Sequence, residues 1–136
     1  MCKKHLDTAI VVDDDAYFLQ SVGMMLRRVG FTNIKLFLDA FEALDWLQTS
    51  TPCLIVSDLD MPLMTGCEFL SEIRSNPGMD KIPFILNTGN LEPAYRDAAI
   101  NSGANYLFKP YRLEELKEAV MATIQCSDGE PMDHFA

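Results

Sequence analysis

The sequence predicts an α/β fold: a single doubly wound (βα)5 domain with a parallel five-stranded sheet. Five short apolar runs alternate with five segments whose apolar residues recur at helical spacing. A helix between two successive strands makes those strands parallel, because each crossover is right-handed and returns the chain to the same end of the sheet. The length of 136 residues fits one domain.

The first strand is predicted over Thr8–Val12, a β-branched run that stops at three consecutive aspartates. From Asp15 to Val29 the apolar residues fall at i, i+3 and i+4 spacing, which predicts a helix. Gly30 supplies the signal that ends this helix. A weakly alternating run, Asn33–Phe37, predicts the second strand.

Asp39 is a suitable N-cap for the second helix. The inward face of this helix comprises Ala40, Ala43, Leu44 and Leu47. Pro52 precedes the third strand, Cys53–Asp58, whose unbroken apolar run indicates burial on both faces. Gly66 begins the third helix, which directs Phe69, Leu70 and Ile73 inward.

Two more strands are predicted over Ile82–Leu86 and Ala104–Phe108. Between them, Pro93 suits the first turn of a helix that runs to about Ser102. Its apolar face is thin and consists of Ala94, Ala98, Ala99 and Ile100. The last helix has an apolar face of Leu113, Leu116, Val120 and Ile124. We assign residues 1–126 to the domain and expect residues 127–136 to form a flexible tail, because they are polar with Gly and Pro.

Composition and charge narrow the function classes. The formal net charge is −9, which disfavours nucleic-acid binding because phosphate contacts need clustered Lys and Arg. This negative charge suits a protein whose partners are other proteins or cations. No run approaches the ~18 apolar residues of a membrane span. None of the four cysteines forms a Cys-x-x-Cys pair, which argues against zinc and fits reduced thiols in a cytoplasmic protein.

Polar residues of reactive types follow four of the five strands. Asp13 and Asp14 follow the first strand, Asp58 ends the third, and Thr88 and Lys109 follow the fourth and fifth. In open α/β sheets, ligands bind beyond the carboxyl ends of the strands, where the strand order reverses. If the first and third strands are neighbours, the three acids converge.

Three adjacent carboxylates repel one another, and a divalent cation removes that conflict. Oxygen ligands without His or Cys select a hard ion, Mg²⁺ or Mn²⁺. Phosphoryl transfer consists mostly of positioning and charge neutralisation, to which Lys109 adds a positive charge and Thr88 a hydroxyl. The carboxylate not needed for the metal can act as a nucleophile and form an aspartyl phosphate.

Four motifs resemble one known family, the receiver domains of two-component response regulators, over about Thr8–Ile124. VVDDD at Val11–Asp15 is similar to its acidic pair, and DLDMPLMTG at Asp58–Gly66 to its phosphoacceptor loop. Thr88–Gly89 is similar to its Thr/Ser followed by a small residue, and GANYLFKP at Gly103–Pro110 to its final strand with Lys-Pro. The order and spacing of all four carry the resemblance.

The resemblance implies a role for each site residue. Asp58 would be the phosphoacceptor, and it would take the phosphoryl group from a sensor histidine kinase or a histidine phosphotransfer protein. The metal would be held by Asp14 directly, by Asp13 through water, by Asp58 and by the backbone carbonyl of Asp60. The phosphoryl oxygens would be held by Thr88, Gly89 and Lys109.

The resemblance also implies a flavodoxin-like strand order of 2-1-3-4-5 and a two-state switch. Tyr106 would move inward as Thr88 moves toward the phosphoryl group. A downstream protein would bind the face formed by the fourth helix, fifth strand and fifth helix. Three residues depart from the commonest pattern of the family: the acidic Asp60, Asn87 where an apolar residue is commoner, and Gly89, a small residue that the family tolerates.

Two other functions remain open at this stage. Asp58-Leu59-Asp60 also resembles the D-x-D of haloacid-dehalogenase-type phosphohydrolases, although that family carries its magnesium acids downstream of the lysine, unlike Asp13 and Asp14. The chain would also fold as a receiver-shaped binding module that is never phosphorylated. The leading interpretation remains a signalling phosphoacceptor rather than an enzyme.

Overall fold

The structure is a computed structural model that describes residues 6–90 and 92–128, with side chains up to Ile124. Five parallel strands form one sheet in the order β2-β1-β3-β4-β5. Their bounds are Thr8–Val12 for β1, Asn33–Phe37 for β2, Leu54–Asp58 for β3, Phe84–Thr88 for β4 and Asn105–Phe108 for β5. Both the predicted fold class and the strand order are therefore confirmed.

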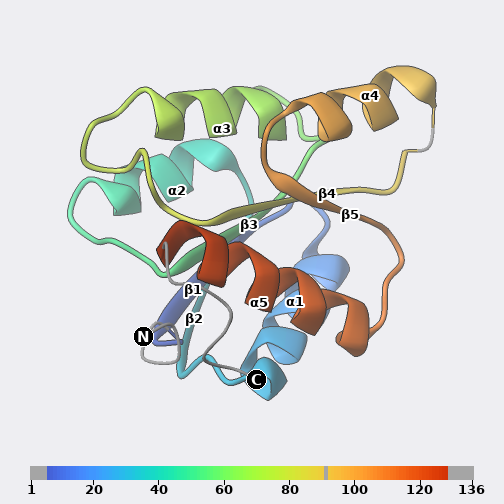
Figure 1. Cartoon of the computed structure of the whole chain (residues 1–136). Coiled ribbons are helices and arrows are strands. Elements are labelled where there is room, and N and C mark those ends of the chain that lie inside the picture. Colours follow the sequence, from blue (N-terminus) through green and yellow to red (C-terminus); the bar gives the residue numbers. More distant parts are fainter. Residues whose placement is uncertain (1–5, 91, 129–136) are drawn as a thin grey trace.

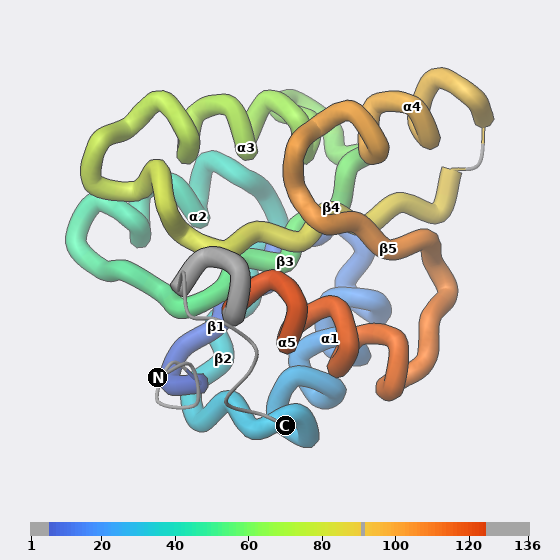
Figure 2. Tube along the Cα trace, viewed as in Figure 1, coloured from blue at the N-terminus to red at the C-terminus, as the bar shows by residue number. Residues whose placement is uncertain are grey.

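Five helices cover the two faces of the sheet. They are α1 (Ala16–Val29), α2 (Ala40–Leu47), α3 (Gly66–Arg74), α4 (Pro93–Asn101) and α5 (Leu113–Asp128). Figure 1 shows α1 and α5 on one face and α2, α3 and α4 on the other, and the trace in Figure 2 has the same layers. The α5 helix extends two residues past the predicted start of the tail, and residues 129–136 lie outside the described residues.

Two cores follow from the alternation of side chains along each strand. Val11, Val56 and Ile85 pack toward α1 and α5, with Leu107 partly buried beside them. Ile10, Ile55 and Leu86 pack toward the opposite helices. No helix in the described part of the chain is long and apolar enough to cross a bilayer.

The fourth strand lies two residues later than predicted. Asn87 pairs with Asp58 of β3 and with Leu107 of β5, and Thr88 pairs with Phe108. The parallel ladder therefore includes two polar residues that lie just after the predicted apolar run. Backbone pairing on both sides outweighs the low strand propensity of Asn.

The α4 helix has less of an apolar face than predicted. Ala99 is its only buried residue, Ala98 and Tyr95 are partly buried, and Ala94 and Ile100 are exposed. Its N-cap, Glu92, makes no side-chain hydrogen bond to the helix. The packing of α4 contrasts with that of α1, where four residues are buried and Asp15 accepts hydrogen bonds from the backbone N–H groups of Tyr17 and Phe18.

Candidate functional site

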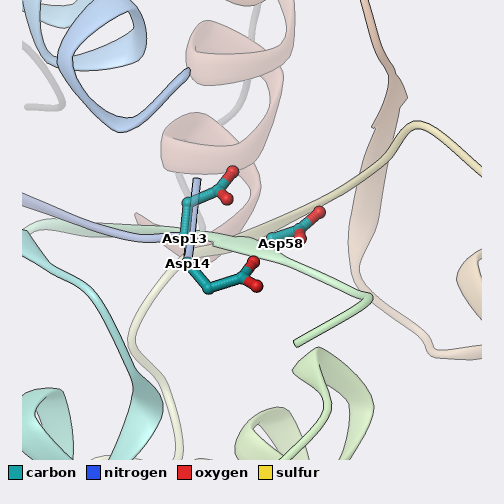
Figure 3. A group of neighbouring side chains, drawn as sticks. All are labelled: Asp13, Asp14 and Asp58. Carbon is teal, nitrogen blue, oxygen red and sulfur yellow. The ribbon is translucent and has the colours of Figure 1, made fainter. Parts of the chain in front are cut away.

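The predicted acids meet at the carboxyl edge of the sheet. β1 and β3 are adjacent strands, and Val12 of β1 pairs with Ser57 of β3. The residues that follow these partners, Asp13 and Asp58, therefore lie side by side. Carboxylate oxygens of Asp13, Asp14 and Asp58 lie within 4.8 Å of one another. Figure 3 shows Asp13 and Asp14 extending from the end of β1 toward Asp58 at the end of β3.

Lys109 joins two of these carboxylates. Its Nζ lies 2.9 Å from Asp13 Oδ2 and 3.1 Å from Asp58 Oδ1. The backbone N–H of Lys109 donates to the carbonyl of Thr88 at 2.8 Å, which fixes the residue against the end of β4. The ammonium also lies 4.1 Å from the centroid of the Phe18 ring, an arrangement that favours a cation.

The acids of the site carry excess negative charge. Asp13 and Asp58 are both buried. The pKa of Asp58 is raised to about 6, chiefly by burial and also by the charge of Asp13, while Lys109 acts against this rise. Burial also raises the pKa of Asp13, although hydrogen bonds from the Asp15 backbone and Lys109 oppose it.

The pKa of Lys109 is raised as well. Burial alone would lower it, but the hydrogen bond to Asp13 and the charge of Asp58 outweigh that effect. One ammonium is therefore shared between two buried carboxylates, while Asp14 adds a third, exposed carboxylate. Oxygen donors at this spacing, with a surplus of negative charge, suit a hard divalent cation.

The acids line a cleft of about 830 Å³. Among the described residues, Lys109 is the only basic residue lining it, and the remaining polar lining is acidic or amide: Asp13, Asp14, Asp15, Asp58, Asp60, Asn90 and Glu92. Gly89 also lines it and leaves the approach open, since a Cβ there would meet Lys109 side-chain atoms only at 3.5 Å. The cleft is therefore acidic at both its floor and its rim.

The loop after Asp58 needs Gly66. A Cβ on Gly66 would overlap the Asp58 carbonyl oxygen and lie 2.8 Å from Leu59 Cα. The Gly66 N–H donates to the Leu59 carbonyl at 2.8 Å, so the loop folds back directly onto the end of β3. Thr65 and Glu68 then begin α3 with a capping box. Asp60 lies on this loop with its side chain exposed.

The Thr88 and Tyr106 side chains are not hydrogen-bonded to Asp58. Thr88 is buried, and its hydroxyl hydrogen-bonds with Asn90, accepting from the Asn90 N–H at 3.1 Å and donating to the Asn90 carbonyl at 3.4 Å. Tyr106 is 38% exposed and packs against Phe108. Both lie on the α4 side of the sheet, because Thr88 and Tyr106 alternate with Asn87 and Leu107 along their strands.

Sequence reasoning missed several residues around the site. Phe18 was expected only in the helix core, yet its ring contacts Lys109. Asn90 holds the Thr88 hydroxyl, and Glu92 adds charge at the rim. The signal for Phe18 was available: it lies three residues after the N-cap Asp15, in the first turn of a helix that starts at the site.

The chain matches the family model described as "Response regulator receiver domain" over residues 9–121. It belongs to the receiver-domain family of response regulators. A receiver domain is the module of a two-component signalling system that carries such an acidic site. The arrangement of acids disfavours the phosphohydrolase alternative, because Asp13 and Asp14 gather on Asp58 while the Asp60 side chain is exposed at the rim.

Two similar proteins show the range of relatives of this receiver. The response regulator MprA of Mycobacterium ulcerans is 33% identical over 131 residues, covering 93% of this chain and 55% of that protein. A probable chemotaxis protein CheY of Rhizobium etli is 32% identical over 114 residues, covering 83% of this chain and 88% of that protein. The chain thus spans about half the length of the MprA relatives that it matches.

Solved receiver structures share the fold. The receiver domain of the Francisella response regulator 1452 superposes with a TM-score of 0.75 at 25% identity, covering 88% of this chain and 98% of that chain. The receiver domain of the sensor histidine kinase PA1611 from Pseudomonas aeruginosa superposes with a TM-score of 0.78 at 24% identity, covering 86% and 96%. The latter structure has a magnesium ion coordinated in its active-site cleft.

Proposed function

We propose that this receiver accepts a phosphoryl group on Asp58 from a phosphohistidine of a sensor histidine kinase or a histidine phosphotransfer protein. The observation that carries the proposal is the Lys109 ammonium shared between Asp13 and Asp58, with Asp14 beside them. A nucleophilic carboxylate needs neighbouring positive charge to approach a phosphoryl group, and this arrangement supplies it.

The transfer moves one phosphoryl group from nitrogen to oxygen. A carboxylate oxygen of Asp58 attacks phosphorus, the P–O bond forms, and the P–N bond to the donor imidazole breaks with its electron pair returning to nitrogen. Lys109 would hold the incoming phosphoryl oxygens, together with the Thr88 hydroxyl and Gly89. The hydroxyl must first exchange its hydrogen bonds with Asn90.

The acidic cluster also suits Mg²⁺, with Mn²⁺ as a possible substitute. The raised pKa of Asp58 and Asp13, together with oxygen-only donors within 4.8 Å, is the environment that a hard cation relieves. Asp13, Asp14, Asp58 and the backbone carbonyl of Asp60 would hold it. When bound, it neutralises charge between the carboxylates and a phosphoryl oxygen.

Output would pass through the α4–β5–α5 face to a downstream protein. Phosphorylation adds negative charge beside Thr88, and movement of that side chain would leave space for Tyr106, which is now exposed. The net charge of −9 supports a protein partner rather than direct nucleic-acid binding by this domain. No catalysis beyond self-phosphorylation and dephosphorylation is proposed.

Incubation with a small phosphodonor and Mg²⁺ tests the proposal. Intact mass spectrometry should detect one added phosphoryl group on the wild type and on Asp60→Asn, and none on Asp58→Asn. Asp60→Asn is the matched control, because it removes an exposed carboxylate two residues away. Equal labelling of Asp58→Asn and the wild type would overturn the assignment, and labelling unaffected by a chelator would overturn the metal requirement.

A further inference from the structure

Two buried polar side chains, Asn87 and Tyr111, lie beneath the acidic site. Asn87 is 1% exposed and Tyr111 is 7% exposed. Among the described residues, Asn87 Oδ1 and the Tyr111 hydroxyl are the buried side-chain atoms without a hydrogen-bond partner. An unpaired buried polar atom is costly and rare in folded proteins, so two of them near one site need an explanation.

The two side chains face the same side of the sheet. Asn87 follows Ile85 by two residues in β4, so its side chain points to the α1/α5 face, where Ile85 and Tyr111 belong to one core. Burial raises the pKa of the Tyr111 hydroxyl, the Asn87 side chain lowers it through hydrogen bonding, and the charges of Asp13 and Asp58 raise it further. A hydroxyl donates one proton and an amide oxygen accepts one. The lowering of the pKa is the effect of an amide N–H that faces the phenol oxygen. A half-turn of the Asn87 amide about its last bond exchanges the N–H group and Oδ1, and a single hydrogen bond from the Tyr111 hydroxyl to Oδ1 then satisfies both atoms at once.

Tyr111 is connected to Lys109 through Phe18. The rings of Tyr111 and Phe18 meet edge to face, with centroids 5.7 Å apart and planes at 86°. The other contact of Phe18 is the Lys109 ammonium, 4.1 Å from its ring centroid. Tyr111 also follows Lys109 by only two residues, so its anchoring restricts the backbone that carries the lysine.

Asn87 is connected to Asp58 through the sheet. The two residues are paired in the β3–β4 ladder, and the Asn87 carbonyl accepts from the N–H of Leu59, the residue after Asp58, at 2.7 Å. Asn87 therefore lies on the β3 side of the site, while Tyr111 lies on the Lys109 side. A hydrogen bond between them joins the backbone that carries the acceptor to the backbone that carries the lysine.

We propose that the Asn87–Tyr111 pair is a positioning element that holds Lys109 against Asp58 and Asp13. This inference rests on the proposed phosphoacceptor function. The pair then has opposite effects on Mg²⁺ binding and on phosphoryl transfer, because Lys109 and a divalent cation compete for the same carboxylates. Loosening Lys109 favours the binding of Mg²⁺ and slows phosphoryl transfer, since less positive charge meets the phosphoryl oxygens.

The pair is distinguishable from ordinary core packing. The three preceding residues of β4, Phe84, Ile85 and Leu86, are all apolar, so Asn87 is a polar exception in the strand. Tyr111→Phe removes only the hydroxyl and retains the ring that packs on Phe18. A variant that merely loosens the fold weakens Mg²⁺ binding and phosphorylation together, whereas the positioning role moves them in opposite directions.

The experiment compares Tyr111→Phe, Asn87→Leu and the double variant in the whole chain. With a small phosphodonor, each single variant should be phosphorylated about three- to tenfold more slowly than the wild type. This is the range expected when one interaction between two coupled residues is lost. The affinity of each single variant for Mg²⁺ alone, followed by nuclear magnetic resonance, should be higher than that of the wild type. The double variant should be phosphorylated faster than expected from multiplying the rate losses of the two single variants. The reason is that the two substitutions together leave no buried polar atom of the pair without a partner.

Tyr95→Phe is the matched control, because it removes a half-buried tyrosine hydroxyl on α4, outside the site. The proposal would be overturned if the single variants behaved like the wild type. It would also be overturned if the two effects on the phosphorylation rate simply multiplied in the double variant, or if the Mg²⁺ affinity fell together with the rate. If the wild type itself is not phosphorylated, the proposed function fails. In that case, non-additive melting temperatures of the single and double variants still show whether Asn87 and Tyr111 are coupled. The Mg²⁺ titration still shows whether the pair positions Lys109.

Discussion

The two faces of the sheet differ in what they contribute to the site. On the α1/α5 face lie Asp13, Asp58 and Lys109, joined by ion pairs of 2.9 and 3.1 Å. On the other face, near α4, lie Thr88 and Tyr106, and α4 buries a single residue. The charged face is tightly connected, whereas the α4 face is thinly packed and free to rearrange. We infer that the α1/α5 face carries the phosphoryl-transfer reaction and that the α4 face changes conformation in response to it.

The largest effect is expected from removing the lysine of the charged face. Lys109→Ala leaves Asp13 and Asp58 buried without their shared cation, so phosphorylation should fall by roughly 100-fold or more, as for other lost electrostatic contacts. The rate with a small phosphodonor at saturating Mg²⁺ measures this. A rate within threefold of the wild type would show that Lys109 does not act on the phosphoryl group.

Gly66→Ala should disturb the loop that carries Asp60. The added Cβ would overlap the Asp58 carbonyl and approach Leu59 Cα to 2.8 Å, so the backbone must shift. We expect a loss of about 1–3 kcal/mol in the free energy of unfolding, the usual cost of overpacking. Urea denaturation measures it. Gly89→Ala is the matched control, because its Cβ would make only ordinary contacts, and equal losses in both variants would contradict the account.

The stability of the metal-free protein should fall as pH rises from about 4 to about 6. The pKa of Asp58 is raised from 3.8 to about 6, so the folded state binds more protons than the unfolded state in this interval. The total loss should be on the order of 3 kcal/mol, since each pKa unit corresponds to about 1.4 kcal/mol. Asp58→Asn should flatten this part of the profile of unfolding free energy against pH. An equally steep profile in that variant would assign the effect to another group.

The smallest effect is expected on the α4 face. The Arg96 guanidinium lies 5.7 Å from the centroid of the Phe108 ring, and both residues are at least partly exposed. Arg96→Ala should cost only about 0.5–1 kcal/mol, the range of exposed cation–π contacts. Thermal denaturation measures it. A loss as large as that of Gly66→Ala would show that α4 is not the loosely held element inferred here.

The fold class was predictable from order along the chain, whereas the convergence of the acids also needed the strand order that the family resemblance implies. Alternating strands and helices determine parallel pairing, and parallel strands bring their carboxyl ends to one edge. What sequence reasoning missed depends on tertiary packing. The extension of β4 through Asn87 and Thr88 requires pairing on both sides, and the contact of Phe18 with Lys109 joins residues from opposite ends of the chain.

Hydrogen exchange of the α4–β5 segment tests the reacting and responding faces most directly. Peptides from α4 and β5 and peptides from α1 should be compared before and after phosphorylation with a small phosphodonor and Mg²⁺. The account predicts altered exchange in α4 and β5, little change in α1, and no change anywhere in Asp58→Asn. Unchanged exchange in α4 and β5 of the phosphorylated wild type, or the same change in Asp58→Asn, would contradict it.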